Sequence, residues 1–203
     1  MILNHIRDIM SRGKPVAVTL CDEKSEDCSL LYCELIQKAR YGEFFIIKNQ
    51  GCPVGAYVLG DTDKNPSDYY YDSGRYKDKK ASEAAVSSLR KLEKRNMSIS
   101  IAPYSGGDFD VLILFLTPER AMRIIQAYTY RNGNPARIKS GGIASVCSDC
   151  TVSALEGNFV ISPGCKGSRK HSKYGDDEII IGLPRDLAER IDEALGKIPE
   201  TRG

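Results

Sequence analysis

The sequence lacks a hydrophobic run long enough to cross a membrane. A membrane-spanning helix needs roughly 18 to 20 consecutive apolar residues, and polar or charged residues interrupt every apolar stretch of this chain well before that length. The first ten residues carry charges among their apolar positions and do not follow the plan of a secretion signal. We therefore expect a soluble, cytoplasmic protein that does not insert into a membrane.

An excess of charge of either sign is missing as well. The 203 residues include 29 Lys and Arg against 27 Asp and Glu. A dedicated nucleic-acid-binding protein usually has a strong basic excess, so this balance argues against that class of function. The hydrophobic fraction of 41% is enough for an ordinary packed core. Because the chain has neither an internal repeat nor a clear domain boundary, its length predicts a single domain over residues 1–203.

Two well-known cysteine arrangements are absent. The chain has no closely spaced run of three cysteines, as radical enzymes use, and no Cys-x-x-Cys-x-x-Cys-x-x-x-Cys run of the ferredoxin type. Histidine is also scarce, since only His5 and His171 occur. A zinc site that uses His171 therefore has little support.

Seven cysteines are nevertheless present, and in a cytoplasmic protein they point to metal ligands or reactive thiols rather than to disulfides. Cys147 and Cys150 form a Cys-x-x-Cys, and Cys165 follows in the same glycine-bracketed stretch, residues 141–169. Cys52 occupies another glycine-rich turn. Glycine and proline beside cysteine usually bend the chain so that the sulfur points into a small pocket.

These cysteines allow several interpretations. Scattered ligands suit an iron–sulfur cluster, because a cluster spans several ångströms. A tetrahedral zinc site is usually built from two Cys-x-x-Cys pairs, and one is present here. A redox dithiol should open a helix, whereas β-branched residues follow this pair, and two unrelated buried cysteines are the plainest alternative. The pattern favours the iron–sulfur cluster, with zinc as the alternative cofactor.

The candidate ligands follow from this interpretation, and they are Cys52, Cys147, Cys150, Cys165 and Cys33. Cys33 is equally well explained as a small apolar residue on the buried face of a helix. Lys166 and Arg169 follow Cys165 and could balance thiolate charge or hold an anionic substrate. The alternative for these two residues is a solvated basic loop.

Hydrophobic periodicity predicts an α+β domain with a central mixed or mostly antiparallel sheet, helices packed on it and cysteines in turns at one sheet edge. Strands are predicted at residues 15–20, 43–48, 56–59, 98–102, 110–116, 143–146, 158–161 and 178–182. Helices are predicted at residues 2–12, from 25 or 27 to 40, 81–95, 118–131 and 184–195. The polar segment 60–80 is expected to form a flap or a self-packed loop. Its tyrosine run either lines a pocket or packs the rim of that loop.

Several blocks of sequence carry a family resemblance. They are Pro15-Val-Ala-Val, Cys33, Ala39-Arg40-Tyr41-Gly42-Glu43, Cys52-Pro-Val-Gly55, Leu59-Gly60, Tyr71-Asp-Ser-Gly74-Arg75, Asp110-Val-Leu-Ile-Leu-Phe, Pro118-Glu-Arg-Ala-Met122, Gln126-Ala-Tyr128, Gly133, Cys147, Gly164-Cys165-Lys-Gly-Ser-Arg169, Asp177-Glu178 and Gly182-Leu-Pro184. In these blocks the chain resembles the archaeal cysteine-rich family called domain of unknown function 169.

The resemblance implies an anaerobic archaeal or bacterial setting and a metal or iron–sulfur role, without naming a reaction. The cysteines that the family shares match Cys33, Cys52, Cys165 and one of Cys147 and Cys150. We therefore expect an iron–sulfur protein of the [4Fe–4S] type. With three ligands an open iron would act as a Lewis acid on a small anionic substrate. With four ligands the cluster would pass electrons to a redox partner.

The alternative function is a zinc-stabilised, non-catalytic binding module in which the metal joins two halves of the fold. In either case the thiolates must meet, because they ligate one small site. We therefore predict that Cys52, Cys165 and at least one of Cys147 and Cys150 converge in one pocket, although about a hundred residues separate Cys52 from the others.

Overall fold

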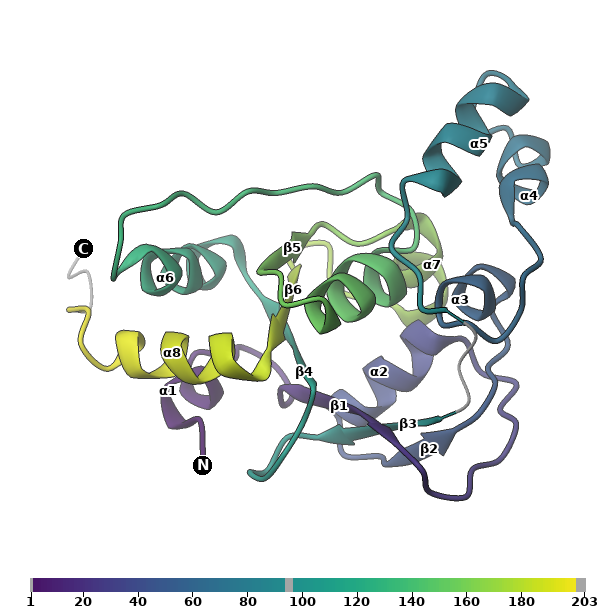
Figure 1. Cartoon of the computed structure of the whole chain (residues 1–203). Coiled ribbons are helices and arrows are strands. Elements are labelled where there is room, and N and C mark those ends of the chain that lie inside the picture. Colours follow the sequence, from purple (N-terminus) through teal and green to yellow (C-terminus); the bar gives the residue numbers. More distant parts are fainter. Residues whose placement is uncertain (1, 94–96, 200–203) are drawn as a thin grey trace.

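The computed structural model describes residues 2–93 and 97–199 (Figure 1). Its strands are β1 (Val16–Cys21), β2 (Phe45–Ile47), β3 (Ser98–Pro103), β4 (Val111–Leu116), β5 (Val160–Ser162) and β6 (Ile179–Pro184). Within the described residues they form one six-stranded sheet in the order β2-β3-β1-β4-β6-β5. Neighbouring strands of this sheet run antiparallel. This confirms the predicted α+β fold with a mostly antiparallel sheet and helices packed on it.

β4 shows why the most apolar run of the sequence lies at the centre of the fold. All of its side chains are buried. Val111, Ile113 and Phe115 belong to one hydrophobic cluster, and the three leucines between and after them belong to another. Because successive side chains of a strand point to opposite faces of the sheet, β4 is covered on both sides.

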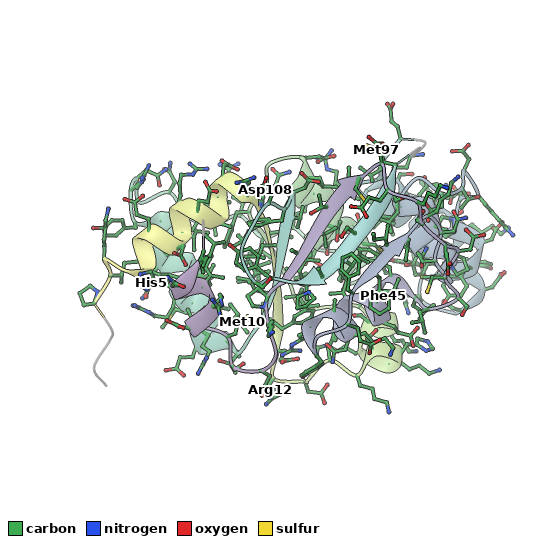
Figure 2. The ribbon with its side chains drawn as sticks, turned by 90° about the horizontal axis from the view of Figure 1, so that it is seen from below. His5, Met10, Arg12, Phe45, Met97 and Asp108 are labelled. Carbon is green, nitrogen blue, oxygen red and sulfur yellow. The ribbon has the colours of Figure 1, made fainter. Side chains whose placement is uncertain are left out.

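One face of the sheet is covered by α1 (Asn4–Asp8), α6 (Pro118–Thr129) and α8 (Arg185–Leu195). Pro118 opens the first turn of α6, where a missing N–H costs nothing. In the view from below, His5 lies on the same side of the strands as α8, and Phe45 of β2 lies across the strands from them (Figure 2).

The other face is covered by α2 (Tyr32–Arg40), α3 (Pro53–Val58) and the π-helix η1 (Ser145–Ser153), and α7 (Lys166–Ser172) packs against α2 in this layer. α4 (Ser67–Asp72) and α5 (Lys79–Ser87) pack against each other and project beside this layer (Figure 1). The predicted cysteine ligands come from this second layer. They lie in or next to the helices over one face of the sheet, rather than in turns along one of its edges.

Four predicted elements are wrong. Residues 56–58 of the predicted strand 56–59 belong to helix α3, residues 143–146 lead into η1, the segment 60–80 contains α4, and the basic segment after Cys165 forms α7. The same feature starts both α3 and α7. The cysteine before each helix accepts a backbone N–H of the first turn, the role that Ser or Asp usually plays. These short cysteine caps carry no sequence signal that distinguishes them from turns.

Several boundaries also differ from the prediction. The first helix is limited to Asn4–Asp8. α2 begins only at Tyr32, because the Glu34 carboxylate accepts the backbone N–H of Leu31 at 2.8 Å and so caps the helix there. α5 ends at Ser87, and the last two residues of the predicted helix 81–95 lie outside the described residues.

Candidate functional site

A cavity of about 370 Å³ lies in the layer formed by α2, α3, η1 and α7, with α4 beside it. Cys33, Cys52, Cys147 and Cys165 line this cavity. They come from four separate segments of the chain, and the structure thus brings together the cysteines whose convergence the sequence predicts. We call this space the four-cysteine cavity.

Cys52 and Cys165 occupy equivalent positions, each directly before a helix. The Cys52 sulfur accepts the Gly55 N–H at 3.4 Å, and the Cys165 sulfur accepts the Ser168 N–H at 3.4 Å. Burial raises the pKa of the Cys52 thiol, while the Gly55 N–H opposes that rise. An N–H that points at a sulfur favours its thiolate form, which suits Cys52 as a metal ligand, and the same kind of contact holds the Cys165 sulfur in place.

Gln50 fixes the turn that carries Cys52. Its side-chain oxygen accepts the N–H groups of Cys52 at 2.7 Å and of Tyr32 at 3.3 Å, and its side-chain nitrogen donates to the Cys52 carbonyl at 2.9 Å. The Cys52 turn is thereby tied to the first turn of α2, which contains Cys33. Sequence reasoning did not single out Gln50; the only available signal was a polar residue in a glycine-rich turn.

Cys147 is buried in η1. The helix starts after Ala144, which has a positive φ of 49°, an unusual conformation for a residue with a side chain. The Cys147 thiol donates to the Ala144 carbonyl at 3.5 Å. Burial raises the pKa of Cys147 well above its ordinary value, and the charges of Cys52, Cys165 and Cys33 add to that rise. π-helical segments occur often at functional sites.

Cys33 lies in the first turn of α2. Burial raises the pKa of its thiol to about 11, and nearby Cys165 and Cys52 add to the rise. The Tyr174 hydroxyl donates to the Cys33 carbonyl at 2.7 Å, and the Tyr174 ring packs on Phe115 with 4.8 Å between centroids. Cys33 is therefore anchored through Tyr174 to the central strand β4.

Cys150 does not line the cavity, although it shares the Cys-x-x-Cys with Cys147. Its backbone lies against β6, so closely that a Cβ added to Gly182 would be 2.2 Å from the Cys150 carbonyl oxygen. Burial raises the pKa of the Cys150 thiol well above its ordinary value. The π-helix thus directs Cys147 to the cavity and packs Cys150 against the sheet.

Lys166 and Arg169 are likewise not among the residues that line the cavity. Arg169 donates to the carbonyls of Pro163 at 2.6 Å, Gly175 at 2.6 Å and Glu178 at 2.9 Å. Its guanidinium therefore holds together the segments that flank α7.

The cation that does line the cavity is Arg75, which sequence reasoning did not select as a site residue. Its guanidinium lies over the ring of Tyr70, 5.1 Å from the centroid. Tyr69 and Tyr70 line the cavity as well, as does His171. Tyr69 and Tyr70 of the tyrosine run therefore line a pocket, which is one of its two interpretations. A signal for Arg75 was its place in a block that carries the family resemblance.

The donor set suits a soft metal, because thiolates prefer zinc and iron–sulfur clusters. Across residues 2–93 and 97–199, however, no three His, Cys, Asp or Glu side chains are grouped closely enough to hold a single metal ion. The four thiols surround the cavity rather than meeting at one point. Their role as ligands stays a prediction.

Residues 8–194 match the family called domain of unknown function 169 (DUF169), described as uncharacterised ArCR. The chain belongs to this DUF169 family. The predicted resemblance is thereby confirmed, and the four cavity cysteines all fall inside the matched range.

A protein of Methanocaldococcus jannaschii, named Uncharacterized protein MJ0308, is 28% identical to this DUF169 chain over 211 residues. The match covers 94% of this chain and 90% of that protein. No solved structure is similar enough to count as a match. In the part of the chain that the structure describes, no helix combines the length and the apolar character needed to cross a membrane.

Proposed function

We propose that this DUF169 protein is a cytoplasmic iron–sulfur protein of anaerobic archaeal or bacterial metabolism, with a cluster of the [4Fe–4S] type in the four-cysteine cavity. One observation carries the proposal: Cys33, Cys52, Cys147 and Cys165 line a single cavity. Cysteine thiolates are the usual ligands of such clusters. All seven cysteines are free thiols, as ligands must be before a cofactor binds.

The electrostatics of the cavity support a cationic occupant. Burial raises the pKa of the thiols of Cys33, Cys52 and Cys147, and the charge of nearby Cys165 adds to the rise in each of them. Thiolates in this cavity would repel one another, so they need a positive group between them. A bound metal or cluster core supplies that charge and replaces the protons, which couples its binding to the fold around the cavity.

The two candidate cofactors differ in the ligand spacing that they need. A single zinc ion needs four donors at about 2.0 to 2.3 Å, and within the described chain no group of three donors is close enough for one ion. A cluster spans several ångströms and accepts ligands that lie farther apart. We therefore prefer the cluster. The alternative is a zinc-stabilised binding module, which the set of four cysteines would also suit if the sulfurs moved together.

The role of the cluster depends on how many of the four cysteines ligate it. Ligation by all four would close the cluster, which would then transfer electrons to a redox partner. Release of one cysteine would expose an iron that can act as a Lewis acid towards a hydroxyl or carbonyl group. Cys150, which packs against β6, is left out of the proposed ligand set.

Metal analysis of the full chain tests this proposal. The protein is purified without oxygen, and its iron, acid-labile sulfide and zinc are measured per chain. We expect iron and sulfide in near-equal amounts. Stoichiometric zinc without iron would contradict the iron–sulfur cluster and support the binding module. Protein treated with a chelator and reconstituted with zinc alone serves as the reference for that alternative.

A further inference from the structure

Arg75 brings to the four-cysteine cavity a positive charge that has no carboxylate partner among the described residues. Among the described residues that line the cavity, Arg75 is the only lysine or arginine and Glu34 the only acidic residue. The Glu34 carboxylate is turned to the backbone, where it accepts the Leu31 N–H at 2.8 Å. No carboxylate of the described chain forms an ion pair with Arg75.

The position of Arg75 is fixed by its surroundings. It follows Gly74, whose positive φ of 69° forms a tight turn after α4, and its own N–H donates to the Tyr70 carbonyl at 3.3 Å. The guanidinium then lies over the Tyr70 ring, which is only 3% exposed. A cation that rests on a buried aromatic face is partly desolvated, yet its planar edge stays available for hydrogen bonds.

The remaining wall of the cavity is largely apolar. Leu31, Val54 and Val146 line it together with the rings of Tyr69 and Tyr70. A volume of about 370 Å³ falls within the range of small-molecule sites in proteins, roughly 300 to 1,000 Å³. The cavity thus combines one planar cation with a wall that suits the carbon body of a small molecule.

We propose that the four-cysteine cavity binds a small organic monocarboxylate, whose charged group pairs with Arg75 and whose apolar body packs against Val54 and Val146. The guanidinium fork matches a carboxylate through two parallel hydrogen bonds. One cation neutralises a monoanion, whereas a phosphate would gather further donors and has no apolar body. This inference rests on the proposed function, since the carboxylate would lie beside the cysteines that hold the cluster.

Calorimetric titration of the anaerobically purified full chain tests the inference. The probes are acetate, pyruvate and benzoate, with acetamide and benzamide as their neutral counterparts and inorganic phosphate as the competing anion. At least one carboxylate is expected to bind more tightly than its amide. Arg75→Gln should weaken that binding roughly tenfold to hundredfold, the loss typical of a charged hydrogen-bonded pair. Arg75→Lys should restore part of it, because it keeps the charge but not the planar fork.

Arg137→Gln is the matched control. Arg137 is exposed and does not line the four-cysteine cavity, so this variant should keep the wild-type affinity. The inference is overturned if no carboxylate binds, if the amides bind equally well, if phosphate binds in place of the carboxylates, or if Arg75→Gln has no effect.

The iron content of each variant separates the two proposals. Arg75→Gln should keep the iron and sulfide of the wild type, because Arg75 supplies no thiolate. Iron and sulfide without carboxylate binding would end this inference and leave the proposed function standing. If the protein contains no iron or sulfide but still binds a carboxylate through Arg75, the proposed function is contradicted and the carboxylate site stands.

Discussion

Arg40 and Glu178 form an ion pair in the interior, between α2 and the start of β6. Their side chains are 1% and 2% exposed, and the guanidinium meets both carboxylate oxygens. Arg40 also donates to the Arg12 carbonyl and lies over the Phe115 ring, 4.5 Å from its centroid. Both residues belong to blocks that carry the family resemblance. A buried charge is tolerated only while it is paired, so this pair governs how the layer that carries the cysteines sits on the sheet.

Arg40→Met should therefore lower the free energy of unfolding by about 3 to 5 kcal/mol, because it removes the buried partner of the Glu178 carboxylate and leaves only the Gly175 N–H and the more distant Arg12 guanidinium beside it. Urea unfolding measures the loss. Arg12→Met is the matched control, since Arg12 pairs with Asp177 at the surface, where exposed pairs contribute little, and approaches Glu178 only to 3.9 Å. The double variant Arg40→Met with Glu178→Leu should regain much of the loss. Equal effects of Arg40→Met and Arg12→Met would contradict this account.

Glu178 also predicts a pH dependence. Burial alone would raise its pKa, but the hydrogen bonds from Arg40 and Gly175 and the charge of Arg40 outweigh burial, so its pKa lies below the usual value. The unfolded chain has a glutamate pKa of about 4.3. The contribution of the ionised Glu178 carboxylate to the free energy of unfolding is thus complete above that pH. It is lost as the pH falls through the lower pKa of the folded state. Glu178→Gln should flatten the fall in stability below about pH 4.3; an unchanged slope would refute the assignment.

At the scale of elements, η1 and β6 lie in direct contact. The π-helix approaches β6 at Gly182, where the Cys150 backbone occupies the space of a side chain. Cys147 lies on the same π-helix and lines the cavity. The glycine therefore sets how deep η1 lies, and with it the height of Cys147 above the sheet.

Gly182→Ala should force η1 away from β6 and lower the free energy of unfolding by about 1 to 3 kcal/mol, the usual cost of overpacking. The same displacement should reduce the iron bound per chain, because Cys147 moves with the helix. Gly141→Ala is the control, since a Cβ there would meet only the Ile143 side chain at 3.7 Å. Thermal unfolding and iron analysis of both variants test the point, and a Gly182→Ala protein indistinguishable from Gly141→Ala would disprove it.

At the scale of the whole molecule, the sheet separates two layers with different tasks. α1, α6 and α8 pack on one face through an apolar cluster that contains no cysteine of the described chain. α2, α3, η1 and α7 pack on the other face and surround the four-cysteine cavity. We infer that the first layer supports the sheet and the second carries the site.

Leu114→Asp tests the role of the sheet as the common support. Leu114 is fully buried in β4, in the cluster shared with the first layer. A charge placed there has no partner, so soluble folding should be lost. Ile138→Asp is the control, because Ile138 is 61% exposed. Soluble yield and circular dichroism give the answer, and a Leu114→Asp protein as stable as the parent would refute the placement of β4.

The parts of the fold with a strong local signal could be predicted from sequence. The run around β4 was long and apolar, and α6 and α8 had a clear helical period opened by Pro118 or Pro184. η1 could not be predicted, because both valines and both cysteines in it are buried and a short element buried all round has no period that separates helix from strand.

The candidate site also has parts that the sequence could predict and parts that it could not. Cysteines in glycine-rich stretches were enough to predict that Cys52, Cys165 and at least one of Cys147 and Cys150 share a pocket, and the structure shows that Cys147 is the one that does. The side chain of Arg75, the packing of Cys150 against Gly182 and the turn held by Gln50 depend on contacts between distant segments, which a single sequence does not contain. The single domain over residues 1–203 and the role of the cysteines as ligands stay predictions.

The iron and acid-labile sulfide bound by Cys147→Ala and Cys150→Ala, purified side by side without oxygen, test the central claim most directly. Both cysteines lie on η1 and both are buried, but only Cys147 lines the cavity. Circular dichroism confirms that each variant is folded. The account predicts that Cys150→Ala keeps the iron and sulfide of the wild type and that Cys147→Ala loses at least half of both. Equal retention by the two variants, or loss from Cys150→Ala alone, would contradict it.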